Sequence, residues 1–149
     1  MNGLRWTRLR RALASAAVLV LATGAQGPVH AQASAQKSVD VTSPEYKRGR
    51  LLYIQCRACH DLQPSEFEKI GPNLAGLRGR KAAADAAFAY SPALQAAASK
   101  LVWDKATLDR WLEKPAAVVP GNTMAFAGIS NPADRVALLA YLEAETSAR

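Results

Sequence analysis

The chain has 149 residues, a formal net charge of +7 at pH 7 and two cysteines, Cys56 and Cys59. This length suits one small domain. The basic residues form no stripe with interleaved aromatic residues, which argues against nucleic-acid binding. A structural zinc site needs about four ligands, and the sequence contains no second Cys/His pair to complete one.

Residues 1–31 have the pattern of a secretory signal peptide. Four arginines come first, and the apolar run from Ala12 to Ala25 is too short to span a bilayer comfortably. Small residues then lead to a cleavage site after Ala31, although an uncleaved membrane anchor is an alternative. Cleavage would lower the formal net charge from +7 to +3, because this segment holds four arginines and no acidic residue. We expect export to the periplasm, a flexible tail over residues 32–43 and one domain over residues 44–149.

The exported part has helix signals and no convincing strand pattern, which predicts an all-α domain. Ser43-Pro44 is typical of a helix start, and this helix should run to about Arg57. Further helices are expected from Ser91 to Lys100, from Asp104 or Lys105 to Glu113, and from Asn131-Pro132 onward. The segment 116–126 contains Pro and Gly without a regular period, and we expect an apolar loop there.

Apolar residues at helical spacing predict which faces of these helices are buried. The three predicted faces are Gly49, Leu52 and Tyr53; Leu108, Trp111 and Leu112; and Val136, Leu139, Ala140 and Tyr141.

Cys56-Arg57-Ala58-Cys59-His60 is a C-x-x-C-H motif, which is typical of c-type heme attachment. Two thiols at this spacing can form thioether bonds to the vinyl groups of one porphyrin, and the adjacent imidazole can bind the iron. The alternatives are a dithiol redox pair, a disulfide or a chance match in a loop. A redox pair is expected in a βαβ context, which the sequence pattern does not show. Export agrees with heme attachment, because c-type heme is attached on the far side of the energy-transducing membrane.

By elimination, Met124 is the expected ligand at the second axial position of the iron. Outside residues 1–31, His60 is the only histidine and Met124 the only methionine. A thioether opposite an imidazole raises the reduction potential of the iron, and a lysine ligand or an open site are the alternatives. An iron with two strong axial ligands has no vacancy for a substrate, which predicts a one-electron carrier and not an enzyme.

Further residues are candidates to contact the heme. Pro72 lies twelve residues after His60, and its loop could supply the carbonyl that orients the axial imidazole, although an ordinary turn also fits. Arg80 lies in the basic segment 77–81, which could bind the heme propionates or be solvated. Trp103 and Trp111 are most simply core residues, and with heme present they are also candidate walls of its pocket.

From Tyr46 to about Glu145 the chain resembles a class I cytochrome c of the small mitochondrial and bacterial type. The matching pieces, in the family's order and nearly its spacing, are CRACH, GPNLAGLRGRK, FAYS, TLDRWLEKP, VPGNTMAFAG and DRVALLAYL. The resemblance implies that the first and last helices cross where Gly49 meets Tyr141, and that shorter helices surround one buried heme.

The resemblance also implies roles for single residues. His60 and Met124 match the axial ligands, and Pro72 matches the proline whose carbonyl accepts the hydrogen bond of the axial imidazole. The remaining matches are Arg80, Tyr90 and Trp103, which bond or enclose the propionates, and Phe126, which lies beside the exposed heme edge.

The chain departs from the family pattern at several positions. Trp111 replaces a tyrosine that touches the ligating sulfur in mitochondrial proteins, and Gly49 is one residue closer to the first cysteine than is common. Ala116, Ala117 and Thr123 replace partner-binding lysines. We therefore expect a monomer that exchanges electrons with redox proteins, with transient contacts to membrane-bound complexes but without a broad lysine ring. The alternative is a heme c subunit of a periplasmic dehydrogenase or another redox enzyme complex.

Overall fold

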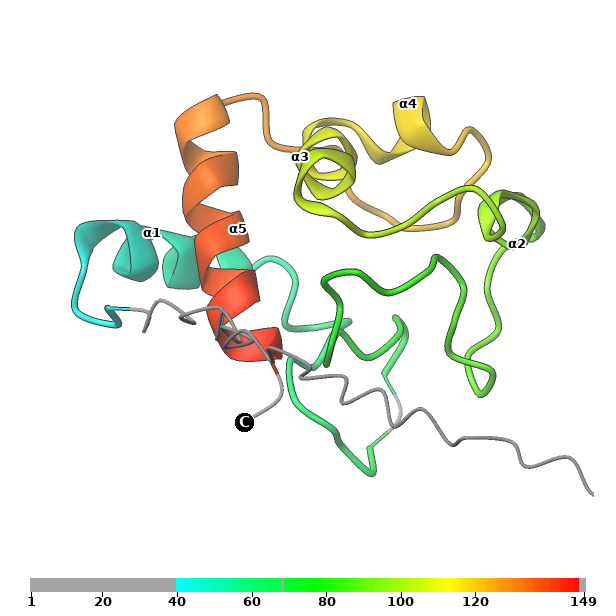
Figure 1. Ribbon diagram of the computed structural model, residues 1–149, viewed down its shortest axis with the longest axis horizontal. Helices are drawn as coiled ribbons and strands as arrows, with labels where there is room; N and C mark the ends of the chain where they lie inside the picture. Colours follow the sequence, from blue (N-terminus) through cyan, green and yellow to red (C-terminus); the bar gives the residue numbers. More distant parts are fainter. Residues whose placement is uncertain (1–39, 68, 148–149) are drawn as a thin grey trace, which may run out of the picture. The chain divides into compact units, whose positions relative to one another are not determined.

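The computed structural model describes residues 40–67 and 69–147, and Figure 1 shows how their helices are arranged. These residues lie within one unit that spans residues 37–149. The predicted signal peptide and all but the last four residues of the predicted tail lie outside the described residues. The helices are α1 (Pro44–Tyr53), α2 (Pro92–Ala97), α3 (Lys105–Glu113), α4 (Pro115–Val118) and α5 (Pro132–Thr146).

Most helices in the described ranges begin directly after a side chain that caps their first turn. Ser43, Ser91, Asp104 and Asn131 each accept a hydrogen bond from a backbone N–H two or three residues further along, at 2.7 to 3.2 Å. After Ser43, Ser91 and Asn131 a proline occupies the first helical position, where a missing N–H costs nothing. The helix starts predicted at these residues are therefore confirmed.

Helices α1 and α5 cross in direct contact, as Figure 1 shows. A β-carbon on Gly49 would overlap the carbonyl oxygen of Ala137 and lie 2.6 Å from the β-carbon of Tyr141. The ring of Tyr141 also packs against Tyr46 and Tyr53, with centroids 5.1 and 5.6 Å apart. The crossing expected at Gly49 and Tyr141 is thus present, and only glycine permits this approach of the two backbones.

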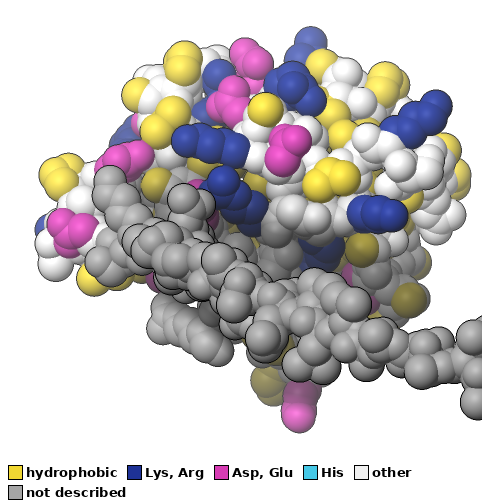
Figure 2. All heavy atoms as spheres, viewed as in Figure 1, with side chains coloured by type: hydrophobic (Ala, Val, Ile, Leu, Met, Phe, Trp, Pro, Cys, Tyr) yellow, Lys and Arg dark blue, Asp and Glu magenta, His cyan; other side chains and the backbone are white. Residues whose placement is uncertain are grey.

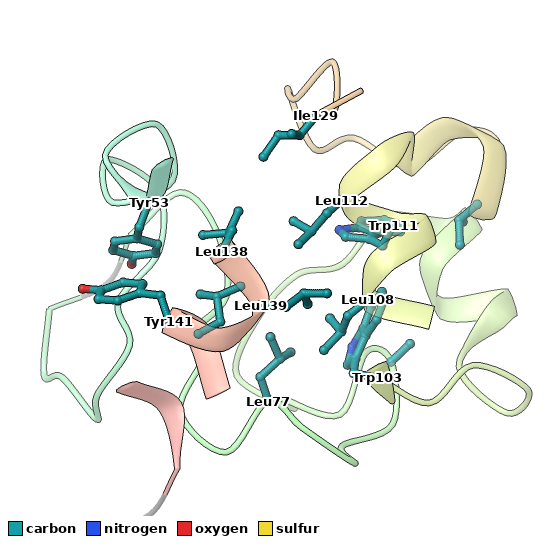
Figure 3. Close-up of a cluster of buried hydrophobic side chains, with 13 residues drawn as sticks. Tyr53, Leu77, Trp103, Leu108, Trp111, Leu112, Ile129, Leu138, Leu139 and Tyr141 are labelled. Atoms are coloured by element: carbon teal, nitrogen blue, oxygen red, sulfur yellow. The ribbon is translucent and has the colours of Figure 1, made fainter. Parts of the chain in front are cut away.

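The core lies between α5, α3 and the segments that follow α1 (Figure 3). Leu138 of α5 is fully buried, and Leu108, Trp111 and Leu112 form the buried face predicted for α3. Arg135 is also buried in α5. Its guanidinium donates to the carboxylate of Asp109 at 2.9 Å and to two backbone carbonyls, which satisfies a charge that would otherwise be costly to bury.

The structure corrects four details of the predicted elements. Helix α1 ends at Tyr53 and not near Arg57, because the next N–H groups bond to carbonyls three residues back and form tight turns. The short helix α4 occupies part of the expected loop, and α2 is shorter than predicted. Val136 was expected to be buried but is 48% exposed, because it lies off the helical stripe of buried residues that starts at Arg135 and continues through Leu138, Leu139 and Leu142. Within residues 40–67 and 69–147, extended pairing is limited to a bridge between residues 81 and 102.

In the described ranges, none of the helices combines the length and the apolar composition needed to cross a membrane.

Candidate heme site

The C-x-x-C-H segment forms one helical turn after α1. The N–H groups of Cys59 and His60 both donate to the carbonyl of Cys56, each at 3.0 Å. Both thiols are free and partly buried. Burial, followed by the neighbouring Cys59, raises the pKa of the Cys56 thiol to about 11. A raised thiol pKa is the opposite of what an activated dithiol requires, so this burial does not favour a redox pair.

A zinc site also finds no support in the structure. Among residues 40–67 and 69–147, no group of three or more His, Cys, Asp or Glu side chains is placed to hold a metal ion.

His60 is held in one orientation by a backbone carbonyl. Its Nδ1 lies 2.7 Å from the carbonyl oxygen of Pro72, and the ring is largely buried. Burial lowers the pKa of His60, with Lys69 acting in the same direction and the Pro72 contact opposing it, so the imidazole is neutral at pH 7. Because a carbonyl can only accept, Nδ1 must carry the proton and donate. The unprotonated Nε2 has no hydrogen-bond partner among the described residues, which is the arrangement of a metal-ligating imidazole.

The loop that carries Pro72 packs tightly against this imidazole. Gly71 donates its N–H to the carbonyl of Cys59 at 2.9 Å. A β-carbon on Gly71 would lie 2.5 Å from Cε1 of His60 and 2.9 Å from the Cys59 carbonyl oxygen. Glycine at this position therefore allows the loop to reach the ring and place the Pro72 carbonyl beside it.

Two side chains that the sequence did not single out hold the backbone of this segment. The Tyr53 hydroxyl donates to the carbonyl of His60 at 2.7 Å. Lys69 donates to the carbonyls of Arg57 and His60 at 2.7 and 3.2 Å and lies 2.6 Å from Asp61. The helical pattern predicted that Tyr53 is buried, but no local signal indicates these long-range bonds.

Arg80 braces the loop around Pro72. Its two terminal nitrogens donate to the carbonyls of Asn73 and Ala75 at 2.8 and 2.9 Å. Tyr90 lies within electrostatic range of this guanidinium. Burial raises the pKa of Tyr90, while a hydrogen bond to the Asp85 backbone and the charge of Arg80 lower it. The sequence anticipated a propionate contact for Arg80 and Tyr90, whereas the contact that the structure shows for Arg80 is with the loop.

Trp103 and Trp111 lie side by side in the core, with ring centroids 5.1 Å apart in an edge-to-face arrangement (Figure 3). Both residues are buried, and neither indole N–H has a hydrogen-bond partner among the described residues. Yet no fully buried side-chain nitrogen or oxygen in those residues lacks a partner. Each of these indole nitrogens therefore keeps some access to solvent, and it is free to donate to a bound group with acceptor oxygens.

Met124 and Phe126 lie in an ordered loop that packs on the same core. The side chain of Asn122 accepts from the Met124 N–H at 3.1 Å and donates to the carbonyl of Val119 at 2.8 Å. Gly128 has φ +105°, and a β-carbon there would overlap the Glu113 carbonyl oxygen. Partly buried side chains of Cys56, Leu74, Met124 and Phe126 all contact the core cluster.

The residues present fit a covalent heme. Two free thiols on one helical turn, a neutral imidazole with an unpartnered Nε2, a thioether and two unpartnered indole N–H groups form the donor set. These are the groups needed to attach a porphyrin, bind its iron and meet its propionates.

Comparison with known proteins agrees with this donor set. The chain is 42% identical over 95 residues to cytochrome c2 of Rhodomicrobium vannielii, which covers 64% of this chain and 74% of that protein. It is 47% identical over 88 residues to cytochrome c2 iso-2 of Magnetospirillum fulvum, covering 59% and 88%. Among solved structures, cytochrome cH from Methylobacterium extorquens matches with a TM-score of 0.59 at 38% identity, covering 66% of this chain and 96% of that chain. No family model matches the sequence.

The fold and the site define a c-type heme protein, and the chain belongs to the class I c-type cytochromes. The predicted all-α cytochrome c fold and the predicted cofactor, one heme c with its iron, are confirmed. Cys56 and Cys59 are the only cysteines available to attach it. The relatives are named as cytochromes, and the chain is an electron-carrier cytochrome.

Proposed function

We propose that the protein is an exported one-electron carrier whose heme iron is held between His60 and Met124. The observation that carries the proposal is the 2.7 Å contact between Nδ1 of His60 and the Pro72 carbonyl oxygen. It fixes the tautomer and leaves the Nε2 lone pair of a buried, neutral imidazole available for a metal.

Met124 is proposed as the second ligand because the chain offers few others. It is the only methionine outside residues 1–31, and no second histidine remains there. Its loop is ordered by Asn122 and packs on the core cluster that also contacts Cys56. With both axial positions taken, the heme supplies a reversible one-electron iron couple and no site for a substrate.

The remaining site residues would surround the porphyrin. Arg80, Tyr90 and Trp103 are proposed to bond or enclose the propionates, with Arg80 also fixing the loop that orients His60. Trp111 and Phe126 are proposed as walls, with Phe126 beside the edge through which electrons pass. These residues exclude water from the iron and keep both ligands in place, so little rearrangement accompanies electron transfer.

We further propose that residues 1–31 direct export to the periplasm, that residues 32–43 form a tail and that residues 44–149 form the cytochrome domain. The partners would be redox proteins that donate and accept single electrons, and the carrier would act as a monomer.

Attachment and redox activity are tested on the purified mature protein. After boiling in detergent, the wild type should keep its heme on the polypeptide and be heavier than its amino acids by one heme. The Cys56→Ala/Cys59→Ala variant should lose the heme under the same treatment. Ascorbate should reduce the native protein, and ferricyanide should reoxidise it by one electron. Loss of heme from the wild type in detergent would refute covalent attachment.

A further inference from the structure

The loop between His60 and Gly71 exposes two large apolar side chains. Phe67 is 84% and Ile70 is 83% exposed, the highest values among the large hydrophobic residues in the described part of the chain. Single exposed apolar residues are ordinary on protein surfaces. Two on one short loop, each almost fully exposed, are a candidate interaction site. Figure 1 shows this loop as a green segment that extends away from the helices.

This loop is anchored to the C-x-x-C-H segment on both sides of Ile70. On one side, Lys69 donates to the carbonyl of Arg57 at 2.7 Å. On the other side, Gly71 donates to the carbonyl of Cys59 at 2.9 Å. The exposed apolar residues are therefore held beside the cysteines that attach the heme.

The two chain segments that carry the proposed ligands, residues 55–71 and 115–133, contain little charge and no cationic excess. The ammonium of Lys69 lies 2.6 Å from the Asp61 carboxylate, so its charge is neutralised locally. By sequence, residues 55–71 contain two basic and three acidic residues, which leaves a net charge of −1. Residues 115–133, which include Met124, contain no Lys, Arg, Asp or Glu. Figure 2 shows basic and acidic side chains interspersed on the face drawn there.

This charge distribution affects how a partner protein associates with the surface. A cationic surface steers acidic partners and increases the association rate, and this surface lacks the charge to do so. An uncharged apolar partner surface complements it instead, because burial of an aromatic and an aliphatic side chain is favourable without electrostatic steering.

We propose that Phe67 and Ile70 form a docking surface for a redox partner protein whose contact surface is apolar and not acidic. This inference rests on the proposed function, since it places the partner next to the attached heme. One electron leaves the reduced protein and is taken up by the oxidised centre of the partner, and no bond forms or breaks. The contact area that two side chains offer is small, so the complex with the redox partner is transient.

The probe is azurin, a soluble blue-copper protein whose surface near the copper is apolar. Stopped-flow spectroscopy follows reduction of its Cu(II) to Cu(I) by the reduced holoprotein. In the Phe67→Ser/Ile70→Ser variant the second-order rate constant should fall about tenfold or more, which corresponds to about 1.4 kcal/mol. The wild-type rate constant should change less than about threefold between about 0.02 and 0.5 M NaCl, because few charges are left to screen.

The matched control is Val41→Ser/Val136→Ser, which removes apolar side chains that are 55% and 48% exposed at the start of the domain and on α5. It should leave the rate constant within about twofold, since neither residue adjoins the proposed surface. Equal rate constants for the wild type and the Phe67/Ile70 variant would overturn the proposal. A rate that decreases steeply with salt would also overturn it, because charge would then dominate association.

Small reagents separate this proposal from the proposed function. A Phe67/Ile70 variant that reacts normally with ascorbate and ferricyanide, but slowly with azurin, supports the docking surface. A wild type that reacts with neither reagent refutes the one-electron carrier itself. Binding to vesicles of phosphatidylcholine and phosphatidylglycerol that requires Phe67 and Ile70, with an unchanged azurin rate, would make a membrane the occupant and overturn the proposal.

Discussion

Gly71 lies so close to the imidazole of His60 that a β-carbon on Gly71 would be 2.5 Å from Cε1 of the ring. The neighbouring Pro72 carbonyl bonds to Nδ1 of the same ring at 2.7 Å. One short loop therefore sets both the position of the imidazole and its tautomer, which links the packing of the fold to the chemistry of the proposed iron ligand.

Gly71→Ala should force the loop and the imidazole apart. We expect the free energy of unfolding to decrease by about 1–3 kcal/mol, and the reduction potential of the holoprotein to change. Gly79→Ala is the control, because its φ of +78° is strained for alanine while no atom lies within 4 Å of the added carbon. It should lower stability and leave the potential unaltered. The same potential in both variants would show that Gly71 does not position the ring.

Gly49→Ala should disrupt the crossing of α1 and α5. The added β-carbon would overlap the carbonyl oxygen of Ala137, so the helices must separate. We expect a loss of about 1–3 kcal/mol in guanidinium unfolding. Leu51→Ala, on the exposed side of α1, should change stability by less than about 0.5 kcal/mol. Equal stability of the two variants would mean that the crossing tolerates a methyl group.

Arg80→Lys tests the brace on the Pro72 loop. An ammonium cannot reproduce the two fixed bonds that the guanidinium makes to the carbonyls of Asn73 and Ala75. We expect a loss of about 1–2 kcal/mol in thermal or guanidinium unfolding. Arg78→Lys is the control, since Arg78 pairs with Glu143 where both side chains are about half exposed, and it should cost less than about 0.5 kcal/mol. A similar loss in both variants would show that the two bonds of Arg80 to the loop stabilise the protein no more than the exposed ion pair of Arg78 does.

The link between Tyr46 and Glu145 predicts a dependence on alkaline pH. The phenol donates to the carboxylate at 2.6 Å, and this bond, followed by burial, raises the pKa of Tyr46 to about 12 from its ordinary value of 10.0. A raised pKa means that the contribution to stability is complete below pH 10 and is lost as the pH rises towards 12. At pH 7, Tyr46→Phe should be about 1 kcal/mol less stable than wild type. This difference should shrink between pH 10 and 12, and a difference that stays constant would contradict the contact.

Helix starts were predictable because their chemistry is local. A serine or asparagine followed by proline caps a helix whatever surrounds it, and α1, α2 and α5 begin at such pairs. The end of α1 was not predictable, because no Gly or Pro marks it in the sequence. The tight turns that follow α1 place the cysteines and His60, and the Tyr53 hydroxyl bonds to the His60 carbonyl there. The exposure of Val136 was missed because an apolar pattern cannot show that Asp109 satisfies a buried Arg135.

The candidate site was predictable where the motif is continuous in sequence and less so where it is assembled across the fold. The C-x-x-C-H spacing and the single methionine outside residues 1–31 identified the proposed ligands, and the bond of His60 to Pro72 was anticipated from the family resemblance. The contacts of Lys69 with the carbonyls of Arg57 and His60 depend on how a long loop folds back, and nothing in the local sequence indicates that path.

The most direct test of axial ligation by His60 and Met124 is the weak absorption band at the red end of the oxidised spectrum, which reports iron–thioether coordination. The wild type should show this band. Met124→Ala should lose it and have a lower reduction potential, because the thioether no longer binds the iron. Thr123→Ala, one residue away and exposed, should keep both properties. A band that persists in Met124→Ala, or that is absent from the wild type, would contradict the proposed ligand pair.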